Sequence, residues 1–251
     1  MNEFTAIKVL WKRELLRFVR AKSRIAGSLG MPLFFLLFLG TGLNSAFSGT
    51  TGNYMEFIAP GIIGMVLMFS SVANGLIVIM DRQFGFLKEI LVAPVSRLSI
   101  VAGKIFGGAT TSIFQAAIIM ALMPFLGVSF NLSGMLAAFV FMVLISIAFV
   151  GLGIAIASKM EDMHGFQLVM NFLVMPLFFL SGALFPITNL PEWLKILTLI
   201  DPLTYGIDGM RGALTGSSAM PFWVDFGVLA LFCTAMFALG AWLFTKKSTG
   251  N

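Results

Sequence analysis

The chain has 251 residues, of which 59% are hydrophobic and only 11% are charged. Soluble domains carry roughly a quarter charged residues, so this chain has too few polar side chains to cover a surface that faces water. The composition excludes a water-soluble fold. The formal net charge of +5 does not indicate nucleic-acid binding, because aromatic stacking positions in a soluble basic domain are missing, whereas orientation in a membrane explains it.

Six uncharged runs are long enough, or nearly so, to cross the hydrocarbon core as a helix, which takes about 20 apolar residues. They predict an all-α polytopic membrane protein with six transmembrane helices, organised as a single domain over residues 1–251. Pro32 in the first run and Pro176 in the fifth make these two helices the hardest to delimit. The runs are 25–43, 57–80, 105–126, 135–157, 166–184 and 226–244.

The distribution of positive charge predicts the orientation. All 16 Lys and Arg residues except Lys195 and Arg211 lie before the first run, in the second and fourth connections, or after the last run. Because connections rich in Lys and Arg stay in the cytoplasm, we expect a plasma-membrane protein with both termini cytoplasmic.

Residues 1–24 predict an interfacial elbow helix that lies on the membrane surface. Lys and Arg side chains populate one face at helical spacing, and apolar side chains the other. The alternative is a basic flank that only fixes the topology. The apolar face consists of Phe4, Ile7, Trp11, Leu15 and Phe18.

The second cytoplasmic connection, residues 81–104, is too long and too apolar for a simple turn. Phe84, Leu87 and Leu91 form an apolar stripe beside charged residues, and Pro94 ends this short helix. We interpret the loop as a docking surface. The alternative is a segment that lies against the bilayer.

The connection between the fifth and sixth runs, residues 185–221, is apolar but broken by Pro and Gly, so no part of it can span the membrane. It predicts two short helices separated by Asp201 and Pro202, the second over residues 205–214. Two such helices can enter the membrane from outside and return if protein satisfies their backbones. We therefore expect an extracytoplasmic re-entrant hairpin before the sixth span.

Polar residues within the runs are few. Asn74, Gln167 and Asn171 either form interhelical hydrogen bonds or line a substrate pathway. The glycine pair at positions 103 and 107, and Gly151 with Ala155, permit close helix packing. The single histidine, His164, falls in a charged loop without partners for catalysis or for a metal, so we expect no enzyme site and no bound cofactor.

The chain contains no G-x-x-x-x-G-K-[ST] sequence, so it cannot bind ATP in the P-loop manner. Energy from ATP, if used, must come from another polypeptide.

Two sets of motifs resemble the type 2 ABC transporter permeases, and most of all their daunorubicin-resistance and nodulation-factor export branch. The C-terminal signature reads LSGALFP at 180–186, LPEWL at 190–194 and DPLTY at 201–205, with Arg211 six residues later. The loop 87–104, with LKEIL, Pro94, Ser96-Arg97 and Gly103-Lys104, resembles the second cytoplasmic loop of these permeases.

The resemblance implies a membrane-spanning permease that works as a homodimer or heterodimer, contacts membrane lipid and moves an amphipathic, lipid-like or drug-like substrate outward. ATP and Mg would be bound by a separate cytosolic ABC ATPase. The implied ATPase-coupling residues are Phe84, Leu87, Lys88, Glu89, Leu91, Pro94 and Arg97. The implied external gate contains Leu190, Trp193, Pro202, Tyr205, Asp208 and Arg211.

Two other functions stay open at this point. One is an ATPase-independent channel or secondary carrier, although such a carrier usually shows broken helices in both halves, and here the Gly and Pro interruptions follow the fifth span. The other is a membrane anchor for a partner, which would need the docking loop but not the external hairpin.

Overall fold

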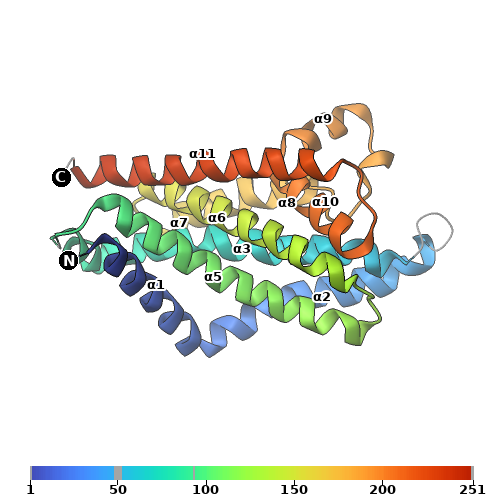
Figure 1. Cartoon of the computed structure of the whole chain (residues 1–251), viewed down its shortest axis with the longest axis horizontal. Helices are drawn as coiled ribbons and strands as arrows, with labels where there is room; N and C mark the ends of the chain where they lie inside the picture. The colour runs from blue at the N-terminus through green and yellow to red at the C-terminus, as the bar shows by residue number, and fades with distance from the viewer. Residues whose placement is uncertain (1, 48–52, 93, 250–251) are drawn as a thin grey trace.

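The computed structural model describes residues 2–47, 53–92 and 94–249, and this part of the chain is helical with short connections (Figure 1). The α-helices are α1 Glu3–Arg20, α2 Lys22–Phe47, α3 Tyr54–Gln83, α4 Phe86–Val92, α5 Arg97–Leu122, α6 Met135–Lys159, α7 Met163–Val169, α8 Met175–Leu180, α9 Glu192–Ile200, α10 Pro202–Thr215 and α11 Phe222–Thr249. Short 3-10 turns cover Met123–Leu126, Leu132–Gly134 and Ile187–Asn189.

Six spans are long and apolar enough to cross a membrane, which confirms the six predicted runs. The first covers Ile25–Leu43, as predicted, and the second, third, fourth and sixth extend past the uncharged runs. The fifth, Met163–Leu180, begins three residues before its predicted run and ends four residues before the predicted end. The fifth combines α7, a π-helical turn over Met170–Val174 and α8. Pro176 lies in the first turn of α8, and its missing N–H accounts for the departure from α-helical bonding there.

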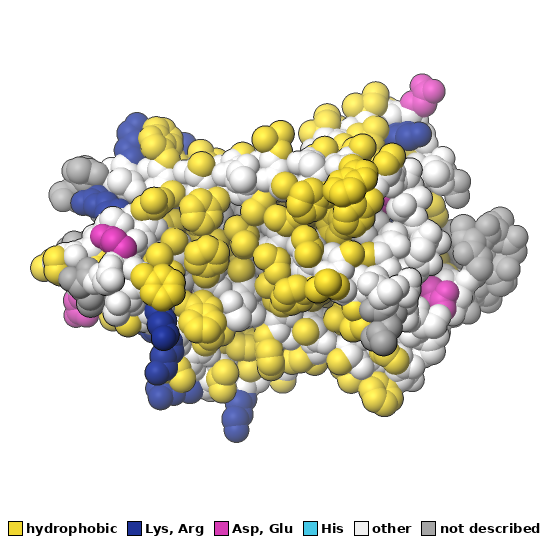
Figure 2. All heavy atoms as spheres, viewed as in Figure 1, with side chains coloured by type: hydrophobic (Ala, Val, Ile, Leu, Met, Phe, Trp, Pro, Cys, Tyr) yellow, Lys and Arg dark blue, Asp and Glu magenta, His cyan; other side chains and the backbone are white. Residues whose placement is uncertain are grey.

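The bundle is built around α3 and α6, whose spans are mostly buried, while α2, α8 and α11 lie outside them. Glycine allows α6 and α11 to come close, because a Cβ at Gly151 would lie 2.8 Å from the carbonyl oxygen of Met236, and one at Gly240 would lie 2.9 Å from that of Gly151. The role predicted for Gly151 in close helix packing is therefore confirmed. Figure 2 shows apolar side chains over the middle of one face and most of its Lys and Arg side chains toward one end.

Helix α1 lies along α5 at the end of the bundle that also holds the C-terminus, which we call the terminal end (Figure 1). Ala6, Leu10 and Glu14 form its buried face, whereas Phe4 is 74% exposed. The predicted apolar face partly coincides with this packed face, because Ile7, Trp11, Leu15 and Phe18 are partly buried and Trp11 Nε1 donates to Thr110 Oγ1 of α5 at 3.0 Å. Gly103 permits this packing, since a Cβ there would lie 2.8 Å from Cβ of Leu10.

The segment before the sixth span forms two short helices at the opposite end, which we call the α10 end (Figure 1). α10 packs against α3, α6 and α11 and buries most of its residues. α9 stays at the periphery and exposes apolar side chains, including Trp193 at 66% and Ile200 at 72%. The prediction of two helices split at Asp201 is confirmed, but α10 starts three residues before the predicted boundary, with Asp201 as its N-cap.

The charge distribution leads to a test of orientation. In a Cys233→Ser background, a single cysteine at Asn131 or Trp193 should react with a membrane-impermeant maleimide added outside, and one at His164 should react only after permeabilisation. Asn131 lies at the α10 end, where its backbone N–H donates to Leu214. Labelling of residue 131 from the cytoplasmic side alone would contradict the predicted orientation.

Candidate functional site

The first candidate surface is the short helix α4 at the terminal end. Phe84 is 76% exposed, and Glu89 and Pro94 are exposed as well. Leu87 is only 7% exposed and belongs to the hydrophobic core, so its assignment to a partner-facing stripe needs correction. The side chains of Lys88 and Leu91, also predicted to couple to an ATPase, lie outside the described residues.

Helix α1 contacts both ends of the segment that contains α4. The Arg13 guanidinium lies over the Phe86 ring at 3.7 Å from its centroid, at the start of α4. At the other end, the Glu3 carboxylate accepts hydrogen bonds from Ser96 N at 3.1 Å and Ser96 Oγ at 2.8 Å. Hydrogen bonds from Ser99 and Ser96 lower the pKa of Glu3, because they stabilise its ionised carboxylate. α4 therefore contacts both α1 and α3.

Arg97, the last of the predicted coupling residues, begins α5. Its Nη1 donates to the backbone oxygen of Thr245 at 3.1 Å, near the end of α11. Its side chain is partly exposed. Arg97 thus connects the α4 segment to the last span.

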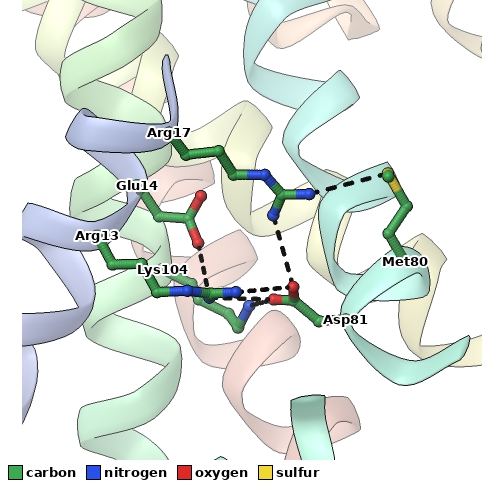
Figure 3. Close-up of polar contacts among 6 residues, drawn as sticks. All are labelled: Arg13, Glu14, Arg17, Met80, Asp81 and Lys104. Atoms are coloured by element: carbon green, nitrogen blue, oxygen red, sulfur yellow. Dashed lines mark hydrogen bonds and ion pairs between the residues drawn. The ribbon is translucent and has the colours of Figure 1, made fainter. Parts of the chain in front are cut away.

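A cluster of five charged side chains joins α1, α3 and α5 just inside the terminal end (Figure 3). Asp81 accepts from Arg13 at 3.1 Å, from Arg17 at 3.5 Å and from Lys104 at 2.5 Å. Glu14 contacts Arg13 at 3.4 Å. The side chains of Asp81 and Lys104 are each 4% exposed, so this ion pair is shielded from water.

Sequence reasoning missed this cluster because it assigned Asp81 and Lys104 to the ends of a loop. α3 instead continues to Gln83, and α5 begins at Arg97, so both residues lie within helices. The available signal was weak. It consisted of opposite charges at the two ends of the loop, facing the basic side of the N-terminal helix.

A cavity of about 390 Å³ lies beside this cluster, between α1, α2, α3, α5 and the fifth span. Glu14 and Arg17 line it from α1, and Asn74, one of the predicted pathway residues, lines it from α3. The other lining residues are mostly apolar and include five phenylalanines and five methionines or prolines: Phe18, Phe35, Phe69, Phe178, Phe179, Met31, Met65, Met170, Met175 and Pro32. The site can therefore hold an apolar molecule with a polar group.

Gln167 and Asn171, the other predicted pathway residues, do not line the cavity. Both are exposed on the fifth span, and Gln167 Nε2 donates to Asn171 Oδ1 at 3.5 Å. The structure therefore separates the three polar residues into one that faces the cavity and two on an outer face of the bundle.

The second candidate site is a buried ion pair at the α10 end. Arg211 Nη1 lies 3.6 Å from Asp208 Oδ1, and the two side chains are 5% and 1% exposed. Arg211 Nη2 donates to the Gly182 oxygen at 2.9 Å, and the guanidinium lies 4.0 Å from the centre of the Phe57 ring. Asp208 accepts from the backbone N–H groups of Ala219 and Met220, each at 2.9 Å. Arg211 thus fastens α10 to α3 and to the end of the fifth span.

The other predicted gate residues lie around this pair. Pro202 occupies the first turn of α10, and Tyr205 Oη donates to the Leu199 oxygen of α9 at 2.7 Å. Asp201 caps α10 by accepting from Leu203 N at 3.0 Å, and burial raises the pKa of Asp201 to about 7. Leu190 is partly buried, whereas Trp193 points away from the bundle.

Known permeases are similar to this chain in sequence. The inner membrane transport permease YadH of Escherichia coli K12 is 28% identical over 251 residues, covering 98% of this chain and 97% of its own. The transport permease ycf38 of Cyanophora paradoxa is 32% identical over 215 residues, covering 84% of this chain and 74% of its own. YbhR of Escherichia coli K12, named as a multidrug ABC transporter permease, is 30% identical over 164 residues, covering 62% of this chain and 43% of its own.

Residues 5–215 match the family described as ABC-2 type transporter. The match includes α1, the α4 segment, the cavity-lining helices and α10. Membership implies that this multi-pass membrane permease works with an ABC ATPase subunit. The chain therefore belongs to the ABC-2 type transporter family.

Proposed function

We propose that this permease is the membrane-spanning half of an ATP-driven exporter, which moves an amphipathic, lipid-like or drug-like molecule outward with energy from a separate ATPase. The observation that carries the proposal is the position of α1. This helix contacts Phe86 and Ser96 at the two ends of the α4 segment and also supplies Glu14 and Arg17 to the cavity. A displacement of α4 by the ATPase would be transmitted through α1 to the cavity wall.

The proposed coupling surface is formed by Phe84, Glu89 and Pro94, which are exposed at the terminal end. Lys88, Leu91 and Arg97 complete it in the proposal. An exposed aromatic side chain at such a surface is a good candidate for an anchor, because a few residues carry most of the energy of an interface. With the terminal end in the cytoplasm, this surface would face the ATPase.

The α10 end would form the outer gate. α10 is held by Arg211 to Gly182 and Phe57, and Tyr205 bonds α9 to it. Leu190, Trp193, Pro202 and Asp208 belong to the same unit. We propose that the two helices lie partly in the outer leaflet as a re-entrant hairpin, and that α1 lies at the inner membrane surface.

A second permease copy would cover the face that carries Gln167 and Asn171. These two amides are exposed in a span that otherwise presents apolar side chains. An amide facing hydrocarbon is unfavourable, whereas one facing a partner helix or a water-filled pathway can form hydrogen bonds. This supports a dimer whose pathway lies along the fifth span.

The test is reconstitution of this permease with its ABC ATPase in proteoliposomes, with ATP hydrolysis and export measured for a panel of lipids and amphipathic drugs. ATP-dependent movement of at least one compound, abolished by a hydrolysis-deficient ATPase, is the expected result. Flux that continues unchanged without the ATPase would replace the exporter by a channel or secondary carrier.

Replacing Phe84 by Asp should separate hydrolysis from transport or release the ATPase, because a charge would occupy the proposed aromatic anchor. A loss of about tenfold in ATPase affinity is expected, equivalent to about 1.4 kcal/mol. Co-purification and ATP-dependent transport measure the effect. Phe4→Asp is the matched control, since Phe4 is 74% exposed at the same end of the bundle.

Leu87→Asp should behave differently, because it buries a carboxylate in the core. We expect it to lower the yield and thermal stability of the permease even without the ATPase. The coupling surface would be misassigned if Phe84→Asp left both complex formation and transport unchanged.

A further inference from the structure

Asp225 lies in the first turn of α11, at the α10 end of the bundle, and its side chain is enclosed by protein. Phe222, Trp223 and Val224, which precede it in the same turn, are exposed, whereas Asp225 is 0% exposed. Neither carboxylate oxygen of Asp225 has a hydrogen-bond partner among the residues that the structure describes. No ion pair of this part of the chain includes Asp225 either.

The helices around Asp225 are closely packed. Leu229, one turn further on the same face of α11, is 0% exposed. A Cβ at Gly206 of α10 would lie 3.5 Å from Leu229 Cδ2 and 2.7 Å from Ile145 Cγ1 of α6. Because α6, α10 and α11 meet this closely, bulk water can reach Asp225 only if α10 and α11 separate.

The ionisable groups that face Asp225 come from α10. Tyr205 and Asp208 are both near enough to interact electrostatically with Asp225. The other helices packed against α11 are α5 and α6. Their ionisable residues lie at the terminal end and are Arg97, Lys104 and Lys159.

Arg211 compensates only one of the two carboxylates. Asp208 has Arg211 at 3.6 Å and accepts from two backbone N–H groups, so its charge is well satisfied. The remaining contacts of Arg211 are with α3 and with the end of the fifth span. An ionised Asp225 would therefore be a second buried negative charge without a cation or a donor, which is strongly unfavourable. Where two carboxylates share a site, one of them retains a proton.

We infer that Asp225 is a proton-binding site, which is a neutral carboxylic acid while α10 and α11 are in contact and loses its proton when they separate. In that step the carboxyl O–H bond breaks, the proton passes to a water molecule that enters from outside, and the carboxylate becomes hydrated. This second part rests on the proposed function, because it takes the α10 end as the outer gate. A low external pH would then hold the gate closed.

The first experiment tests the protonation directly. Infrared spectra of the full chain in nanodiscs at neutral pH should contain a carboxylic-acid C=O band that moves in D2O and that Asp225→Asn removes. Asp162→Asn is the matched control, since Asp162 is exposed on the N-cap of α7 and should lose only carboxylate bands. Neither ATP nor the ATPase is needed.

The second experiment measures opening. Leu229→Cys in a Cys233→Ser background places a thiol one turn from Asp225, and a membrane-impermeant maleimide reaches it only when α10 and α11 separate. Labelling should rise with external pH more steeply than in the Asp225→Asn chain that carries the same thiol. The difference should be up to about tenfold per pH unit, as the loss of one proton on opening predicts.

Asp201 provides the control for the second experiment. Burial raises its pKa to about 7, so it also titrates at the α10 end, but it lies at the junction of α9 and α10. Asparagine is as good an N-cap as aspartate, so Asp201→Asn should keep α10 intact. The steep pH dependence of labelling should persist in Asp201→Asn.

The inference is overturned if the infrared difference between the unmodified chain and Asp225→Asn contains no acid band, or if the two chains show the same pH dependence of labelling. Failure of Asp225→Asn to fold would also count against it, because an amide of the same shape resembles a neutral acid but not a carboxylate held in an ion pair. The proposed function fails separately, if the acid band is present but no compound is exported with ATP.

Discussion

Replacing Arg211 by alanine is expected to abolish transport and to destabilise the permease by about 3–5 kcal/mol. The side chain is 5% exposed and holds α10 to α3 and to the end of the fifth span through Gly182 and Phe57. Its loss leaves Asp208 buried with backbone partners but without a counter-charge. Substrate-stimulated transport and thermal unfolding in nanodiscs measure the two effects.

The control variants for Arg211 distinguish a role in gating from a purely structural role. Lys195→Ala removes an exposed cation from α9 and should change both quantities little. Arg211→Met combined with Asp208→Asn removes both charges, so it should recover much of the stability while transport stays impaired. If Arg211→Ala and Arg211→Lys both transported at the unmodified rate, the gate assignment would have to be abandoned.

Among substitutions at the terminal end, Asp81→Asn should lower the stability of the permease most. Asp81 contacts Arg13, Arg17 and the buried Lys104, whereas the other carboxylate of the cluster, Glu14, contacts Arg13, so neutralising Asp81 removes the ion-pair partner of Lys104. We expect a loss of about 3–5 kcal/mol and detachment of α1 from α3. Thermal unfolding and protease accessibility of residues 1–21 are the measurements.

A double variant tests the cause of this effect. Lys104→Met in the Asp81→Asn background should restore part of the stability, because the two sites interact directly. Asp162→Ala is the graded control, since Asp162 caps α7 by accepting from Gly165 N and lies exposed, where a lost cap is unfavourable by about 1 kcal/mol. A change in melting temperature no larger than that of the control would mean that the cluster contributes little.

The spans were predictable because lipid imposes a simple rule on length and charge. The ends of the spans could not be predicted, because the rule ends a predicted span at the first charged residue. Asp81 and Lys104 continue helically because they neutralise each other across α3 and α5, a contact between residues 23 positions apart that no periodicity records.

The residues of the candidate sites could likewise be predicted only in part. Asp208 and Arg211 were both named through the family resemblance, and in the structure they form an ion pair. Leu87 was taken for a surface residue because an apolar stripe looks the same whether it faces a partner or the chain's own core. Asn74, Gln167 and Asn171 could not be told apart, because their environments depend on how α3 and the fifth span are rotated about their axes.

The π-helical turn over Met170–Val174 divides the fifth span into two α-helical segments. Hydrogen bonds of this turn reach one residue further than in an α-helix, and Pro176 contributes no N–H just after it, so bending is concentrated at this point. A bend at this turn would tilt the segment with Gln167 without displacing Gly182, where Arg211 binds. Such a bend would let the two ends of the fifth span move separately, as a transporter requires if its two ends open in turn.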